Sequence, residues 1–167
     1  MEKFNLKEIF NLEGRENLGH QMPIGVYRLF EHALREYLTE TYGKDFAISV
    51  LQGAGYRAGV MIVEQMMDIT QPFPIFIKEL QKILVDQKMG ILRIERHNKD
   101  TGDLTLTLSE DLDCSGLPMI GETVCNYDEG LLAGILSTYT KHHYTATEID
   151  CWAKGDRVCR FEASIKK

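Results

Sequence analysis

The chain has 167 residues, 44% hydrophobic and 26% charged, which is the balance of one globular domain and excludes a disordered or disulfide-dense protein. Its 19 Lys and Arg residues against 25 Asp and Glu residues give a net charge of −6, which disfavours direct binding to nucleic acid or to an acidic membrane surface. No uninterrupted apolar run reaches the roughly 18 residues of a membrane span, and residues 1–11 lack the apolar core of a secretory signal. We therefore expect a cytoplasmic protein, whose four cysteines are thiols or metal ligands.

The N-terminal half has the period of amphipathic helices. Residues 1–22 have the weakest pattern, and we expect an N-terminal arm or a short strand there, around Phe4, Leu6 and Ile9. From Pro23 onward, apolar residues recur every three or four positions, which predicts three successive helices. These helices are expected over residues 23–43, 46–68 and 74–88.

After Gly90 the apolar period changes to that of a strand. Apolar and polar residues alternate over 92–95 and 104–108, and the turn-forming residues 98–103 between them predict a hairpin. Helices followed by paired strands favour an α+β fold, with helices packed on one face of an antiparallel sheet, and we interpret residues 1–167 as a single domain. The other predicted elements are a loop over 109–122, a helix over 126–141, and a second hairpin with strands over 145–153 and 157–165.

Three cysteines in the C-terminal half occupy positions that suit a metal site. A hairpin centred on Gly155 places Cys151 opposite Cys159, with their Cβ atoms about 5 Å apart on one face of the sheet. Cys125 lies at the predicted start of a helix, where the helix dipole favours a thiolate. With Glu148 as a fourth ligand, the three thiolates would make a closed tetrahedral site of the structural zinc type.

The period of a strand opposes part of this assignment. Glu148 and Cys151 are three residues apart, so a regular strand would direct them to opposite faces, and a bulge near Ile149 is required. Two other interpretations stay open from the residues alone: the cysteines are small buried apolar side chains, or Cys151 and Cys159 form a cross-strand disulfide. Cys114 has no evident partner and is expected to be a packed thiol.

Several stretches of the sequence resemble the 4-vinyl reductase domain family. The resemblance lies in residues 54–59, in residues 125–134, and in the pattern Glu-x-x-Cys-x-Ala-x-Gly-x-x-x-Cys-x-Phe that starts at Glu148 and ends at Phe161. It extends over about residues 18–165. It implies a fold like that of the subunits of the vesicle-tethering transport particle and of the ligand-sensing domains of aromatic-responsive bacterial regulators.

The family resemblance also implies a metal and an assembly. Its phenol-sensing members bind zinc through three cysteines and a glutamate, and the spacing of those ligands is similar to that of Cys125, Glu148, Cys151 and Cys159. The sensing members pair through this domain, so the resemblance implies a two-fold homodimer. Their phenol pocket uses a tryptophan and a histidine, whereas the single tryptophan here, Trp152, lies between the zinc residues, so phenol specificity is not expected.

Other candidate residues have simpler explanations. Gly53, Gly55 and Gly59 lack the spacing of a nucleotide-binding loop, so close helix packing is expected. His142 and His143 adjoin the last hairpin, but adjacent strand residues point to opposite faces, so at most one can join a site. No nucleophile and base form a recognisable pair, and the sequence therefore favours a binding module over an enzyme.

The sequence thus predicts a stand-alone small-molecule-binding sensor or carrier module with a structural zinc site. Its ligand would be a hydrocarbon or an aromatic compound, held between the helices and the sheet. Two alternatives stay open: a 4-vinyl reductase-like enzyme or accessory that acts on a tetrapyrrole, and an assembly subunit with protein partners, similar to those of the tethering particle. The predicted pocket lining consists of Tyr56, Met61, Phe76, Leu80 and Leu106.

Overall fold

Residues 5–11, 13–19 and 21–166 are described by a computed structural model. The chain forms two units, Met1–Ile48 and Ser49–Lys167, and the boundary between them falls within helix α3, Lys44–Met66. Every site residue predicted from the sequence lies in the second unit. The interpretation of the chain as a single domain stays a prediction.

The first unit contains two complete helices, α1 (Leu6–Ile9) and α2 (Ile24–Tyr42). A capping box starts α1: the Asn5 side chain accepts a hydrogen bond from the backbone N–H of Glu8, and the Glu8 carboxylate accepts one from the backbone N–H of Asn5. The possibility of a strand around Leu6 and Ile9 is therefore wrong, while Phe4 lies outside the described residues. Helix α2 confirms the helix predicted over 23–43.

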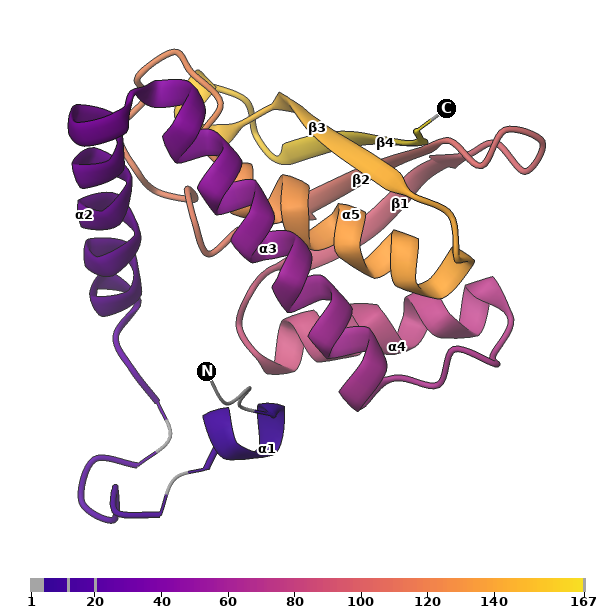
Figure 1. Cartoon of the computed structure of the whole chain (residues 1–167), viewed down its shortest axis with the longest axis horizontal. Helices are drawn as coiled ribbons and strands as arrows, with labels where there is room; N and C mark the ends of the chain where they lie inside the picture. Colours follow the sequence, from indigo (N-terminus) through magenta and orange to yellow (C-terminus); the bar gives the residue numbers. More distant parts are fainter. Residues whose placement is uncertain (1–4, 12, 20, 167) are drawn as a thin grey trace. The chain divides into compact units, whose positions relative to one another are not determined.

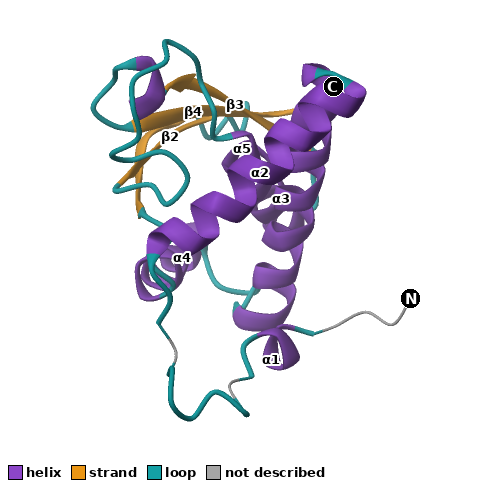
Figure 2. Ribbon diagram, turned by 90° about the vertical axis from the view of Figure 1, so that its left-hand side faces the viewer, coloured by secondary structure: helices purple, strands orange, loops and turns teal. Residues whose placement is uncertain are grey.

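The second unit contains a four-stranded antiparallel sheet and the helices that cover it. The strands have the order β1-β2-β4-β3, and in Figure 1 helix α5 lies between the sheet and α3. Figure 2 shows the strands gathered on one side of α3, α4 and α5. The predicted α+β class is confirmed. The elements are α4 (Phe73–Asp86), β1 (Ile91–His97), β2 (Leu104–Ser109), α5 (Asn126–Thr140), β3 (Tyr144–Asp150) and β4 (Cys159–Ile165).

Helix α5 is buried along most of its length. Its buried side chains include the apolar Leu131 and Ile135 and also the acidic Asp128 and Glu129 near its N-terminus. A helix that is buried on all sides must lie within the core, which agrees with its place between the sheet and α3. The same core includes aromatic side chains from α4 and β4, because Phe76 and Phe161 are fully buried.

Glycines let the backbones of α3 and α5 come into direct contact. At two glycines on each helix, a Cβ atom would lie well inside the contact distance of a carbonyl oxygen on the other helix. The expectation of close helix packing at Gly55 and Gly59 is therefore confirmed, and Gly130 and Gly134 are their partners on α5. The added carbon would lie 1.9 Å from the Tyr127 oxygen at Gly55, 2.3 Å from the Leu131 oxygen at Gly59, 1.9 Å from the Gln52 oxygen at Gly130, and 2.2 Å from the Tyr56 oxygen at Gly134.

Helix α3 is long and apolar enough to cross a membrane, judged by its length and composition alone. The sequence shows no uninterrupted apolar run because Arg57 and Glu64 lie within this helix. Its small residues contact α5, so part of its apolar surface has a role in packing within the second unit.

The last hairpin differs from its prediction at the turn. Residues Asp150 and Arg160 pair, so the hairpin is centred on Gly155 as predicted, and the expected bulge is present between Glu148 and Asp150. Strand β3 nevertheless ends at Asp150, and the predicted continuation to residue 153 is wrong. The chain turns instead through a 3₁₀ helix, Trp152–Lys154, because the carbonyl of Cys151 accepts hydrogen bonds from the backbone N–H groups of residues 154–156.

The contact between α3 and α5 generates the first testable prediction. Gly55→Ala should lower the free energy of unfolding by about 3 kcal/mol or more, because the new carbon meets a backbone oxygen that cannot rotate away. The matched control is Gly53→Ala, on the same helix with open space around the added carbon, which should be neutral or stabilising by up to about 1 kcal/mol. Urea denaturation of both variants measures the difference, and equal stability of the two would contradict the packing.

Candidate metal centre and ligand groove

Four buried cysteines meet in the second unit. The sulfur atoms of Cys114, Cys125, Cys151 and Cys159 all lie within 4.8 Å of one another, and all four residues are free thiols. The Sγ atom of Cys125 lies 3.8 Å from that of Cys151 and 3.7 Å from that of Cys159. Four thiolates around one zinc ion at about 2.3 Å have sulfurs about 3.8 Å apart, so these two separations match a tetrahedral site. The disulfide interpretation of Cys151 and Cys159 is not what the structure has.

Each cysteine comes from a different element or loop. Cys125 immediately precedes α5, Cys151 lies between β3 and the 3₁₀ turn, and Cys159 is the first residue of β4. Strand β4 pairs with both β2 and β3, so the ends of these strands converge. The sequence prediction that Cys125, Cys151 and Cys159 come together agrees with this arrangement.

The expectation that Cys114 has no partner is wrong. Its sulfur lies 3.1 Å from that of Cys159. The side chain of Asp111 accepts hydrogen bonds from the backbone N–H groups of Asp113 and Cys114, which fixes the turn that carries this cysteine. The pairing of Leu108 with Cys159 brings the loop after β2 to the cluster, and this pairing joins strands that are distant in sequence.

Glu148 is buried next to the cluster but is not a member of the group of four. One of its carboxylate oxygens, Oε2, accepts a hydrogen bond of 3.0 Å from the backbone N–H of Cys125. The other, Oε1, is buried and forms no hydrogen bond within the described part of the chain. Burial raises the pKa of Glu148 to about 8. The bulge after Glu148 is what allows this side chain and Cys151 to lie on the same side of the sheet.

The four sulfurs compete for protons. Hydrogen bonding with Cys114 and the other sulfurs raises the pKa of the Cys125 and Cys159 thiols, and lowers the pKa of Cys151. One thiolate is therefore favoured over the others in the metal-free cluster. Removing the remaining protons requires a cation among the sulfurs, which is how thiolate-bound metals couple to proton release.

A group of acidic residues lies against the same cluster. Asp111, Asp113 and Asp128 are buried, and one carboxylate oxygen each of Asp111 and Asp128 lies within 4.8 Å of the Cys125 sulfur and of the other. Burial raises the pKa of Asp111 and of Asp128, and the charges of Asp113 and Asp111 raise that of Asp128 further. This concentration of buried acidic groups is unusual for a purely apolar core.

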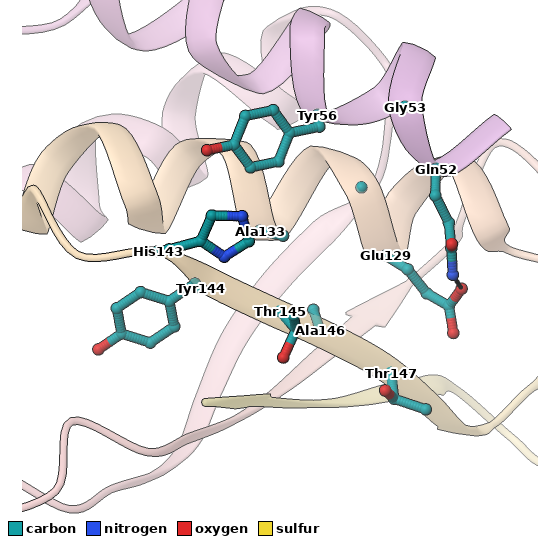
Figure 3. Close-up of a pocket in the computed structure, with 11 residues that line it drawn as sticks. Gln52, Gly53, Tyr56, Glu129, Ala133, His143, Tyr144, Thr145, Ala146 and Thr147 are labelled. Atoms are coloured by element: carbon teal, nitrogen blue, oxygen red, sulfur yellow. Dashed lines mark hydrogen bonds between the residues drawn. The ribbon is translucent and has the colours of Figure 1, made fainter. Parts of the chain in front are cut away.

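A groove of about 420 Å³ runs between α3, α5 and β3 (Figure 3). The rings of Tyr56 and His143 face each other across it, with centroids 6.1 Å apart. Backbone and side chains of β3 form the remaining wall. The lining residues are Gln52, Gly53 and Tyr56 from α3, Glu129, Gly130 and Ala133 from α5, and residues 143–147.

Glu129 connects the groove with the cysteine cluster. Its carboxylate accepts hydrogen bonds of 2.8 Å from the Gln52 side chain, 3.0 Å from the Asn126 side chain and 2.8 Å from the backbone N–H of Glu148. Glu148 in turn accepts the hydrogen bond from the Cys125 N–H. The groove and the cluster are therefore joined by two buried carboxylates in series.

The predicted pocket residues do not all lie together. Tyr56 lines the groove, whereas Phe76, Leu80 and Leu106 are fully buried in the core and Met61 is half-buried on α3. Their role as pocket lining stays a prediction. Sequence reasoning missed Gln52 and Glu129, although Glu129 lies within the stretch 125–134 that carries the family resemblance. His143 was considered and set aside, and it is the histidine that lines the groove.

Three solved structures have a similar fold. The phenol-responsive sensory domain of the transcription activator PoxR, solved with phenol, has a TM-score of 0.67 at 14% identity, over 86% of this chain and 75% of that one. A vinyl-4-reductase family protein from Methanocaldococcus jannaschii has a TM-score of 0.65 at 20% identity, over 100% of this chain and 98% of that one. A trafficking protein particle complex subunit 3 from Naegleria fowleri, covalently bound to palmitic acid, has a TM-score of 0.64 at 14% identity, over 86% of this chain and 95% of that one.

A family model matches the part of the chain that contains the cysteine cluster. Residues 104–165 match the model of the 4-vinyl reductase domain. This range includes β2, β3, β4 and α5 and all four cysteines, but not residues 54–59 of α3. At identities of 20% or less, the structural similarities establish the fold alone. Together, the family match of residues 104–165 and the fold shared with these three structures confirm the predicted resemblance to the 4-vinyl reductase domain family.

Proposed function

We propose that this chain is a small-molecule-binding sensor or carrier module with a structural zinc site. The observation that carries the proposal is the groove lined by Tyr56 and His143, which is joined through Glu129 to a buried cluster of four thiols. The match to the 4-vinyl reductase domain and the likeness to a phenol-responsive sensory domain support a role in ligand binding. We place this function in the cytoplasm, where the thiols stay reduced.

The zinc site uses the three predicted cysteines, Cys125, Cys151 and Cys159, and one further ligand. We assign the fourth position to Cys114, because its sulfur lies within 4.8 Å of the other three. Glu148, the fourth ligand expected from the sequence, is the competing candidate, and its buried Oε1 supports it. In either case four protein ligands leave no open position for water, so zinc would stabilise the fold and take no part in catalysis.

Zinc content separates the two ligand sets. Cys151→Ser should lower both the zinc content and the melting temperature, because it removes a thiolate in either arrangement. Cys114→Ser should lower zinc affinity at least tenfold, while Glu148→Gln should retain one zinc per chain after dialysis against a chelator. Elemental analysis measures the zinc. Retention in Cys114→Ser together with loss in Glu148→Gln would restore the ligand set with glutamate.

The proposed ligand is a small apolar or aromatic molecule. The groove combines the aromatic faces of Tyr56 and His143 with the apolar Ala133 and a few polar groups, which is typical of such sites. Structures of similar fold were solved with phenol and with covalently bound palmitic acid, so this architecture accommodates apolar molecules in other proteins. Both ligands support the assignment of a hydrocarbon or aromatic ligand here.

Adjacent histidines provide a matched test of the groove. His143→Ala should weaken binding of the aromatic probe 1-anilinonaphthalene-8-sulfonate about fivefold, because it removes a stacking contact worth about 1 kcal/mol. His142→Ala, the exposed neighbour outside the groove, should leave probe binding unchanged. Fluorescence titration measures both, and equal affinities would exclude His143 from the site. Native mass spectrometry of the purified chain adds an independent outcome: a co-purified tetrapyrrole would favour the reductase-like alternative.

We also propose that the chain forms a two-fold homodimer. Helix α2 supports this proposal, because it carries exposed apolar side chains such as Leu29 and Phe30, which a partner would cover. Similarity to a subunit of a trafficking particle makes a larger assembly the second candidate. Sedimentation at micromolar concentration should give the mass of a dimer, and a monomer mass would contradict the proposal.

A further inference from the structure

We propose that a second divalent cation binds next to the four-cysteine site, held by Asp111 and Asp128 and sharing the thiolate of Cys125 with the zinc ion. This inference rests on the zinc site of the proposed function. Its basis is that Cys125 belongs to two groups of possible ligands at once, the four sulfurs and the set with Asp111 and Asp128. In each group the ligand atoms lie within 4.8 Å of one another, and all of these residues are buried.

Two carboxylate oxygens in this region give an independent indication of a missing cation. Oδ2 of Asp128 and Oε1 of Glu148 are buried in side chains that are only 5% exposed, and neither forms a hydrogen bond within the described ranges of the chain. Asp128 also forms no ion pair with any residue that the structure describes. Native structures rarely leave a buried charged group without compensation, because its desolvation is so costly.

The charges of the two groups point in the same direction. Four thiolates around one Zn²⁺ have a net charge of −2, and the buried carboxylates of Asp111 and Asp128 add to this negative charge. The positive end of the α5 dipole lies close to Asp128, but its partial charge compensates less than one unit. A second divalent ion would balance these charges, whereas a core residue of positive charge is absent from the ligand group.

The donor set selects the kind of ion. Two carboxylate oxygens and one thiolate suit zinc or a similar borderline transition metal, because calcium and magnesium prefer oxygen ligands alone. Asp111 lies in the loop after β2 and Asp128 in the first turn of α5, so the ion would tie this loop to the helix. We therefore assign a second Zn²⁺ to this position.

Metal counting on the full chain tests the inference. After saturation with Zn²⁺ and gel filtration, the parent protein should carry two zinc ions per chain, and Asp128→Asn should carry one. Asp100→Asn, a substitution of an exposed aspartate in the β1–β2 turn, should keep two. One zinc in the parent would overturn the second site and leave the first intact, whereas no zinc would overturn both. Two zinc ions in both the parent and Asp128→Asn would place the additional ion elsewhere and overturn the assignment.

Cobalt titration of the parent protein gives a second readout that does not depend on the variant folding. Two Co²⁺ ions that share one thiolate are magnetically coupled, so the second equivalent should diminish the electron paramagnetic resonance signal of the first. The absorption of thiolate-bound Co²⁺ should remain in Asp128→Asn, because the four cysteines are intact. Signals that simply add with the second equivalent would contradict a shared thiolate.

Discussion

The direct contact between the backbones of α3 and α5 determines where the functional groups of the second unit lie. Because glycines line the crossing on both helices, the carbonyl oxygens of one helix reach the backbone of the other. This distance brings Gln52 within hydrogen-bonding reach of Glu129 and places Tyr56 at the groove. The same contact holds the N-terminus of α5, and with it Cys125, over the end of the sheet. Larger side chains at the crossing would separate all of these groups.

The second determinant is the series of buried carboxylates that starts at the groove. Glu129 accepts three hydrogen bonds and is thereby satisfied, whereas Glu148 has one oxygen bound to the Cys125 N–H and one without a partner among the described residues. Polar groups in such a series are sensitive to one another, because each fixes the orientation of the next. Occupancy of the groove and of the metal centre are thus joined by a physical connection of few bonds, which is the arrangement a ligand sensor requires.

The metal centre brings together parts of the chain that the sheet alone leaves loosely connected. A loop after β2, the residue before α5 and both strands of the last hairpin each contribute one cysteine. The loop and the turn have few apolar residues in common, so a metal held by all four thiolates would replace hydrophobic packing as their connection. The large number of buried acidic groups in the same region is consistent with a place in the molecule organised around positive ions.

The sequence by itself determined the helices, the strand pairs and the convergence of Cys125, Cys151 and Cys159, because local periodicity and the symmetry of one hairpin carry that information. Even the bulge after Glu148 followed from the conflict between a spacing of three residues and the period of a strand. The structure of the N-terminal segment around Leu6 was missed, because the capping box at Asn5 outweighs its weak strand pattern.

Only the tertiary structure decided the position of Cys114, because the pairing of β2 with β4 joins strands that are separated by a loop, a helix and another strand. The same holds for the groove. Its residues come from α3, α5 and β3, and no local spacing relates Tyr56 to His143 or Gln52 to Glu129. Apolar core residues and pocket residues have the same pattern in a sequence, so burial of Phe76 and Leu80 became visible only in three dimensions. Local rules thus specified the elements, and contacts between distant elements specified the site.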